Sequence, residues 1–243
     1  MRKTNTMEVA EGGLSLGLLE PRVARILASL HRQSKRDKLV ILRALPTGLM
    51  AFFSGKPWFE AVQPQLKAAH LKIGYEAGEL IYNTARAINA KRIVEFGTGF
   101  GFSTIYLAAA VRDNGGGVVI STDLEPNKVK AAGQHLAEAG LSEFVDIRLG
   151  DAMTTLRDVE APIDLVLLDG WKDLYTPLLR MLTPKLRRGS VVFADNVHIF
   201  RNTLRPYVEH MRDRRNGFVS TTLSAGSGLE YSVYLPANGS HSG

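Results

Sequence analysis

Residues 95–103 read Glu-Phe-Gly-Thr-Gly-Phe-Gly-Phe-Ser, and this glycine-rich stretch joins an apolar run at 92–96 to a helical pattern that begins at Phe102. Glycine has no side chain to collide with a ligand and accepts positive φ, so the backbone here can approach a bound molecule closely. The first N–H groups of the following helix have no partner within the helix and can bind a polar ligand. The stretch therefore predicts an α/β fold with a ligand site after its first strand.

Further apolar runs on both sides of this turn extend the same pattern. Buried parallel strands are expected at residues 92–96, 118–122, 145–149, 163–168 and 190–194. Helical patterns accompany them at 76–89, 102–112, 127–139, 175–187 and 203–214. Two β-rich runs, 218–223 and 230–235, flank Ser-Ala-Gly-Ser-Gly and predict an antiparallel hairpin at the edge of the sheet. The alternation is typical of a mostly parallel sheet with helices on both faces.

The length of 243 residues suits one α/β domain, which we place at 71–237. Residues 1–70 contain short helical patterns interrupted by proline and glycine, and we expect a helical N-terminal extension that serves as a lid or as a contact in a homodimer. No apolar segment has the length of a signal peptide or of a membrane span, so the expected location is the cytoplasm, without a membrane partner.

The charged residues and the absence of cysteine narrow the classes of function. The net charge is +6, but the lysines and arginines are scattered and form no continuous stripe, so we expect no nucleic-acid partner. With no cysteine there is no thiolate nucleophile, and any metal must be held by oxygen or imidazole ligands. Hard divalent cations are the expected metals.

Acidic residues follow two of the expected strands. Asp169 comes directly after the run 163–168, and Asp195-Asn196 follows the run 190–194. Because neighbouring parallel strands lie about 4.8 Å apart, their carboxyl ends can bring these groups to one edge of the sheet. Two carboxylates and an amide oxygen suit a hard cation such as Mg²⁺. Lys172 would lie beside that cation and could act as a general base.

Three more side chains are candidates for binding. Asp123 ends the second expected strand, roughly 20 residues after the glycine turn, where a carboxylate can accept hydrogen bonds from ribose hydroxyls. Glu95 is an acid at the end of a buried strand and requires a partner there. Trp171 could form an apolar wall for a flat ring, and it could equally be an ordinary core residue.

With these motifs, Asp-Gly-Trp-Lys-Asp-Leu-Tyr at 169–175, Ala-Asp-Asn-Val at 194–197 and the glycine turn, the chain resembles the catechol O-methyltransferase family of Rossmann-like, S-adenosylmethionine-dependent methyltransferases, in its bacterial form. The resemblance covers residues 72–235 and implies a seven-stranded sheet whose last strand is antiparallel. It also implies transfer of a methyl group to a small, metal-chelated phenol.

The resemblance assigns roles residue by residue. The metal ligands would be Asp169, Asp195 and Asn196, and Lys172 would be the catalytic base. Substrate would contact Trp171, Lys172 and Asn196. We expect the cofactor S-adenosylmethionine to be lined by Ile73, Glu95, Gly97, Thr98, Ser103, Asp123, Leu124, Asp151, Ala152 and Asp169.

This chain departs from the animal enzyme at several of these positions. Gly170 replaces a histidine, which we expect to open the adenine side of the site, Asp123 replaces a glutamate, and Ala152 replaces a serine. No residue matches the acidic residue that clamps the substrate in the animal enzyme. The acceptor is therefore left open by the sequence.

Three alternatives stay open at this point. One is a metal-independent methyltransferase in which Asp195 and Asn196 orient the substrate. The second is a protein that binds or modifies RNA, although no base-stacking motif supports it. The third is a nicotinamide oxidoreductase, whose G-x-G-x-x-G motif would require glycine where this chain has Phe102.

Overall fold

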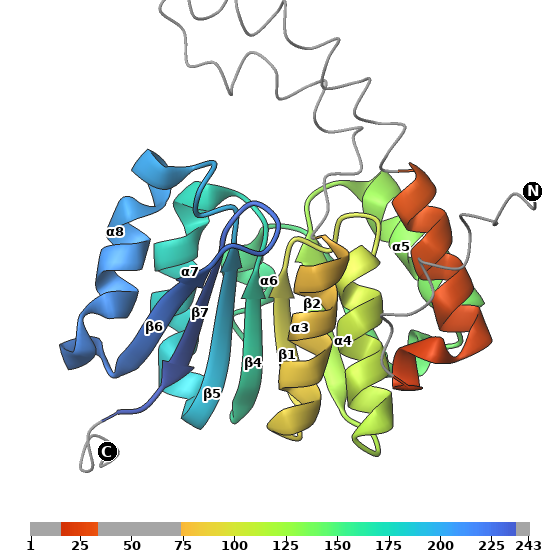
Figure 1. Cartoon of the computed structure of the whole chain (residues 1–243), viewed down its shortest axis with the longest axis horizontal. Coiled ribbons are helices and arrows are strands. Elements are labelled where there is room, and N and C mark those ends of the chain that lie inside the picture. The colour runs from red at the N-terminus through yellow and green to blue at the C-terminus, as the bar shows by residue number, and fades with distance from the viewer. Residues whose placement is uncertain (1–15, 34–73, 237–243) are drawn as a thin grey trace, which may run out of the picture.

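A seven-stranded sheet forms the centre of the protein (Figure 1). The computed structural model describes residues 16–33 and 74–236. The strand order is β3-β2-β1-β4-β5-β7-β6, and β7 alone runs in the direction opposite to the other six strands. The strands are β1 (Arg92–Phe96), β2 (Val118–Asp123), β3 (Val145–Leu149), β4 (Ile163–Leu168), β5 (Leu186–Asp195), β6 (Phe218–Leu223) and β7 (Leu229–Tyr234). The expected Rossmann-like sheet with a C-terminal antiparallel hairpin is confirmed.

Helices cover both faces of this sheet, because the strand side chains alternate between two apolar cores. Ile93 and Leu165 belong to the core under α3 and α4, whereas Val94 and Val166 belong to the core under α6, α7 and α8. The helices are α3 (Tyr75–Ala87), α4 (Phe102–Asp113), α5 (Pro126–Glu138), α6 (Ala152–Thr155), α7 (Tyr175–Leu182) and α8 (Arg201–Arg212). Single 3-10 turns lie at Leu16–Leu19, Ser142–Phe144, Lys172–Leu174, Thr183–Lys185 and Arg214–Asn216.

A helix over residues 21–33 packs onto the fold beside the face that α3 and α4 cover (Figure 1). Its buried side chains Val23, Leu27 and Leu30 belong to the same core as those two helices. Arg112 of α4 forms an ion pair with Glu20, with a nitrogen–oxygen distance of 2.9 Å. This part of the N-terminal extension is therefore attached to the domain. Residues 34–70 lie outside the described residues, as do 1–15, so the lid or dimer role stays a prediction.

Two expected element boundaries are wrong by four residues or more, and one expected burial pattern is wrong. The helix expected over 175–187 ends at Leu182, because Pro184 cannot continue it and instead lies in a 3-10 turn. The strand expected from residue 190 already begins at Leu186, which pairs with Ile163 across a register irregularity. The strand β3 is not buried, because it lies at the edge of the sheet.

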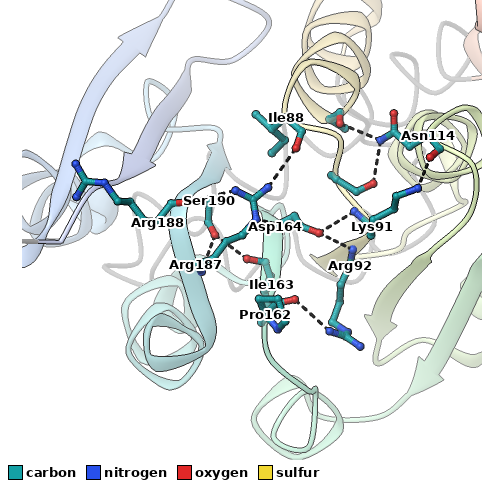
Figure 2. Close-up of polar contacts among 12 residues, drawn as sticks. Ile88, Lys91, Arg92, Asn114, Pro162, Ile163, Asp164, Arg187, Arg188 and Ser190 are labelled. Carbon is teal, nitrogen blue, oxygen red and sulfur yellow. Dashed lines mark hydrogen bonds and ion pairs between the residues drawn. The ribbon is translucent and has the colours of Figure 1, made fainter. Parts of the chain in front are cut away.

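A polar cluster links the amino ends of β1, β4 and β5, at the end of the sheet opposite Asp169 and Asp195 (Figure 2). Buried Asp164 accepts hydrogen bonds from the backbone N–H groups of Lys91 and Arg92, at 2.7 and 2.9 Å. Its other oxygen accepts from Nε of Arg187 at 2.5 Å. The side chains of Lys91 and Arg92, which line a small groove here, also donate to protein oxygens. We therefore interpret the cluster as a structural clamp.

Within the described residues, no helix combines the length and apolar character needed to cross a membrane.

Candidate active site

The strand-end acids meet at the carboxyl edge of the sheet. Leu168 of β4 pairs with Ala194 of β5, so Asp169 and Asp195 are the next residues on adjacent parallel strands. Asp195 is 3% exposed, and the side chain of Asp169 is 16% exposed. The structure brings these two carboxylates together, as the spacing of the sequence predicts.

The two carboxylates are electrostatically unfavourable neighbours. Burial raises the pKa of Asp169 to about 8, and the negative charge of Asp195 contributes to that shift. Burial also raises the pKa of Asp195, against the lowering effect of hydrogen bonds from Asn196 and Ser227. A divalent cation between the two groups would neutralise this repulsion, so the oxygen donors fit a hard cation.

Lys172 lies beside this pair, at the start of the 3-10 turn that leads into α7. Its Nζ is 3.5 Å from Oδ1 of Asp169 and donates a hydrogen bond to the hydroxyl of Tyr175 at 2.8 Å. Burial lowers the pKa of the Lys172 ammonium, against the raising effect of the two carboxylates. The amine also lies 5.6 Å from the centre of the Phe200 ring. A partly desolvated lysine at this place can take up a proton.

The backbone of Asn196 adopts the left-handed conformation, with φ of 70°, which asparagine tolerates better than most residues. Its backbone N–H donates to Oδ1 of Asp195 at 2.7 Å. Its amide nitrogen donates to Oδ2 of Asp195 at 3.1 Å and to Oγ of Ser227 at 2.5 Å. The amide oxygen is thus left as a candidate cation ligand.

Two of the residues in this network are absent from the sequence-based prediction. Tyr175 holds the amine of Lys172 and donates its own hydroxyl hydrogen to the backbone oxygen of Asp195 at 3.2 Å. Its spacing of three residues from Lys172 on a helical turn is a signal that could have found it. Ser227 comes from the β6–β7 loop, and no local pattern indicates its contact with Asp195.

Glu95 is fully buried under the glycine turn, and three hydroxyl groups donate hydrogen bonds to its carboxylate. The Oγ of Ser103 donates to Oε1 at 2.5 Å, while the hydroxyls of Thr104 and Ser121 each donate to Oε2 at 2.6 Å. Burial nevertheless raises the pKa of Glu95 to about 7. Hydroxyl groups therefore supply the partners that the sequence demands for this acid. The sequence predicts Ser103 only as a residue that lines the cofactor, and it does not predict the contacts of Thr104 and Ser121.

The glycine turn has the geometry of a ligand-binding loop. Gly97, Gly99 and Gly101 all have positive φ, and a Cβ on Gly97 would lie 2.7 Å from the backbone oxygen of Asp169. Asp123 accepts a hydrogen bond from the backbone N–H of Gly99 at 2.8 Å, which places this acid beside the turn. The N-terminus of α4 has no side-chain cap and leaves N–H groups for a ligand.

The remaining expected cofactor residues occupy different positions relative to this turn. The hydroxyl of Thr98 faces inward, 2.5 Å from that of Ser121, so only its backbone is left for a ligand. Leu124 and Asp151 are exposed beyond the ends of β2 and β3, whereas Ala152 is buried at the start of α6. Ile73 lies outside the described residues.

The space beside Gly170 is not open, which corrects the expectation from the sequence. A Cβ at this position would lie 2.4–2.6 Å from three atoms of the Phe96 ring. The aromatic ring of β1 therefore occupies the space next to the glycine, and Phe96 is itself 5% exposed. Trp171, the next residue, packs partly buried against the core under α7 and α8.

The candidate cation site has two carboxylates and an amide. Among residues 16–33 and 74–236, no cluster of three or more His, Asp or Glu side chains could hold a metal ion. The third protein ligand would have to be the amide oxygen of Asn196, and the remaining positions would have to come from substrate or water oxygens.

Comparisons with known proteins agree with this architecture. A family model described as a methyltransferase domain matches residues 94–197, from β1 to the loop after β5. The catechol O-methyltransferase of Mycobacterium tuberculosis is 32% identical over 128 residues, which are 52% of this chain and 57% of that protein. Catechol O-methyltransferase B of Danio rerio is 30% identical over 179 residues, covering 68% and 66% of the two chains.

The chain contains a methyltransferase domain and is similar to catechol O-methyltransferases. Among solved structures, the O-methyltransferase TomG from Streptomyces achromogenes, involved in tomaymycin synthesis and solved in complex with S-adenosylmethionine, superposes with a TM-score of 0.63. It is 25% identical, and the match covers 72% of this chain and 86% of TomG. The chain covers less than two thirds of the length of the first curated relatives it matches. What each named protein acts on is thus known for that protein only.

Proposed function

We propose that this protein is an S-adenosylmethionine-dependent O-methyltransferase whose acceptor is a small phenol with two adjacent hydroxyls, such as a catechol, and whose activity requires a divalent cation such as Mg²⁺. The observation that carries the proposal is the convergence of four side chains beside the glycine turn. Asp169, Lys172, Asp195 and Asn196 all reach the same edge of the sheet, and the first two lie 3.5 Å apart.

The cofactor would be held by groups that the fold already positions. The glycine turn and the uncapped N-terminus of α4 offer backbone N–H groups, and Asp123 can accept hydrogen bonds from ribose hydroxyls. S-adenosylmethionine would supply an electrophilic methyl carbon there. Buried Glu95 supports this turn from below through Ser103 of α4.

The cation would be held by the carboxylates of Asp169 and Asp195 and the amide oxygen of Asn196. When bound, it would supply positive charge that lowers the pKa of a chelated hydroxyl, which is otherwise about 10 for a phenol. Lys172 would accept the hydroxyl proton at Nζ. The bound cofactor would supply its methyl group to the deprotonated oxygen and be left as a neutral thioether, while Lys172 would hold the released proton.

The relatives support the acceptor class. Both curated relatives described above are named catechol O-methyltransferases, and residues 94–197 match a methyltransferase domain.

For the N-terminal extension, residues 1–70, we propose that it forms a lid or a contact in a homodimer.

A panel of acceptors tests the proposed function. Catechols, monophenols and a short RNA would be incubated with radiolabelled S-adenosylmethionine, with Mg²⁺ or with a strong chelator. Methylation of catechols that stops in the chelator and returns with added Mg²⁺ is expected. Methylation of monophenols that is equally fast in the chelator would contradict both the acceptor and the cation.

The rival is a metal-independent methyltransferase in which Asp195 and Asn196 orient the acceptor directly. The observation in its favour is that no cluster of three or more His, Asp or Glu side chains within the described residues could hold a metal ion. Full catechol methylation in the chelator would establish the rival while leaving the cofactor site in place.

A further inference from the structure

The β6–β7 loop contacts the candidate cation site through one side chain. The backbone N–H of Val197 donates to the backbone oxygen of Gly228, and that of His198 donates to the backbone oxygen of Ser227, both at 3.1 Å. Gly228 has a φ of 90°, and a Cβ on it would lie 2.8 Å from the backbone nitrogen of His198. This close backbone approach places the half-buried Ser227 against Asp195 and Asn196.

The hydrogen bonds of Ser227 have a direction that the chemistry of the groups determines. The Oγ of Ser227 lies 2.9 Å from Oδ1 of Asp195, and an ionised carboxylate can only accept, so the serine donates its single hydrogen there. Toward Asn196 the same oxygen can then only accept. The nitrogen of the Asn196 amide therefore faces Ser227, at 2.5 Å.

This direction determines what Asn196 presents to a ligand. Its amide nitrogen donates to Ser227 and to Oδ2 of Asp195, so the amide oxygen is the side-chain atom left for a ligand. A hard cation binds the oxygen of an amide and not its nitrogen. Without the hydroxyl of Ser227, the amide would lose the shorter of its two nitrogen contacts and could rotate. Oδ1 of Asp195 would also lose one of its two donors.

We propose that Ser227 is a positioning residue for the cation site: its hydroxyl fixes the amide of Asn196 and the carboxylate of Asp195, so that the amide oxygen and the remaining lone pairs of the carboxylate are available for a divalent cation. The proposal rests on the proposed function, because it assumes that the site binds a cation. Groups that orient metal ligands in this way typically change metal affinity by about 10- to 100-fold when they are removed.

The test measures cation binding directly on the full chain, using Mn²⁺ as the probe and its free-ion electron paramagnetic resonance signal as the readout. Ser227→Ala is expected to raise the Mn²⁺ Kd by about 10-fold or more. Ser227→Thr keeps a hydroxyl and is expected to stay within a few-fold of the parent. Ser224→Ala is the matched control, because Ser224 is an exposed serine of the same loop. S-adenosylmethionine affinity, measured without cation, is expected to be the same in all four proteins.

The outcomes separate this proposal from the function on which it rests. If the parent binds Mn²⁺ and Ser227→Ala binds it equally well, the role of Ser227 is wrong and the proposed function stands. If Ser227→Ala and Ser224→Ala weaken binding equally, the effect belongs to the loop and the role is also wrong. If the parent binds no Mn²⁺, the cation part of the proposed function fails, and the role of Ser227 fails with it.

Discussion

Nζ of Lys172 lies 3.5 Å from Oδ1 of Asp169, with the side chains 12% and 16% exposed. The amine is further held by Tyr175, whose hydroxyl accepts its hydrogen bond at 2.8 Å. A lysine placed in this way has little freedom to swing into solvent. In the proposed function, it would take up the proton that a chelated hydroxyl releases.

Replacing this lysine tests its role as a base. Lys172→Ala is expected to lower kcat for catechol methylation by about 10²- to 10⁴-fold, the usual contribution of a positioned base. The Kd for S-adenosylmethionine, measured by calorimetry, should change little, because the glycine turn and Asp123 are untouched. Lys130→Ala, at an exposed position of α5, serves as the control. A kcat for Lys172→Ala equal to that of the parent would show that another group takes the proton.

The buried carboxyl of Glu95 predicts a dependence of stability on pH. Its pKa is raised to about 7 in the folded protein, so between pH 4.5 and 7 the folded state retains a proton that the unfolded state has lost. The free energy of unfolding should therefore fall as pH rises through this range, by about 3 kcal/mol from this group.

Urea unfolding of the cofactor-free protein at pH 5 and pH 8 measures the effect. Glu95→Gln cannot ionise, so its stability should fall less than that of the parent between the two pH values. Equal losses in both proteins would mean that Glu95 does not titrate in this range.

The contact between Gly170 and the ring of Phe96 predicts a coupled pair of substitutions. Gly170→Ala adds a Cβ within 2.6 Å of ring atoms and should lower the free energy of unfolding by about 1–3 kcal/mol. Phe96→Leu removes part of the ring. Because the smaller side chain leaves room for the new methyl group, the double variant should be more stable than the sum of the two single effects predicts. Strict additivity in thermal unfolding would contradict the contact.

Removing the clamp at Asp164 is expected to lower the free energy of unfolding without lowering the methylation activity. Asp164→Ala leaves two backbone N–H groups and Arg187 without their acceptor and should cost about 3 kcal/mol. Asp158→Ala is the control, because that side chain is 78% exposed and its ion pair with Arg148 should contribute about 1 kcal/mol or less. The activity of folded Asp164→Ala should match the parent, since the clamp lies at the opposite end of β4 from Asp169. A large fall in its kcat would contradict that separation.

Local pattern predicts most of the sheet, because apolar runs and their breaks are local properties. The strands at 92–96, 145–149, 163–168 and 218–223 match the structure residue for residue. The start of β5 was missed because Arg187-Arg188-Gly189 resembles a loop, and its strand geometry comes from pairing with β4 and from the bond between Ser190 and Ile163.

In the candidate site, too, local pattern predicts some of the contacts and misses others. Asp169, Asp195 and Lys172 follow strands in the sequence, so the topology of a parallel sheet is enough to bring them together. Ser227 is separated from Asp195 by 32 residues, and Ser121 is separated from Glu95 by 26. Contacts of this kind depend on how loops and neighbouring strands pack, which no local pattern encodes.

The proposed function requires Asp169 and Asp195 to hold a divalent cation together. Mn²⁺ binding to the parent, Asp169→Asn and Asp195→Asn tests this requirement. The parent should bind one Mn²⁺, and each amide variant should bind it at least about 10-fold more weakly, because a charged ligand has been replaced by a neutral one. Binding of equal strength in all three proteins, or none in the parent, would contradict the claim.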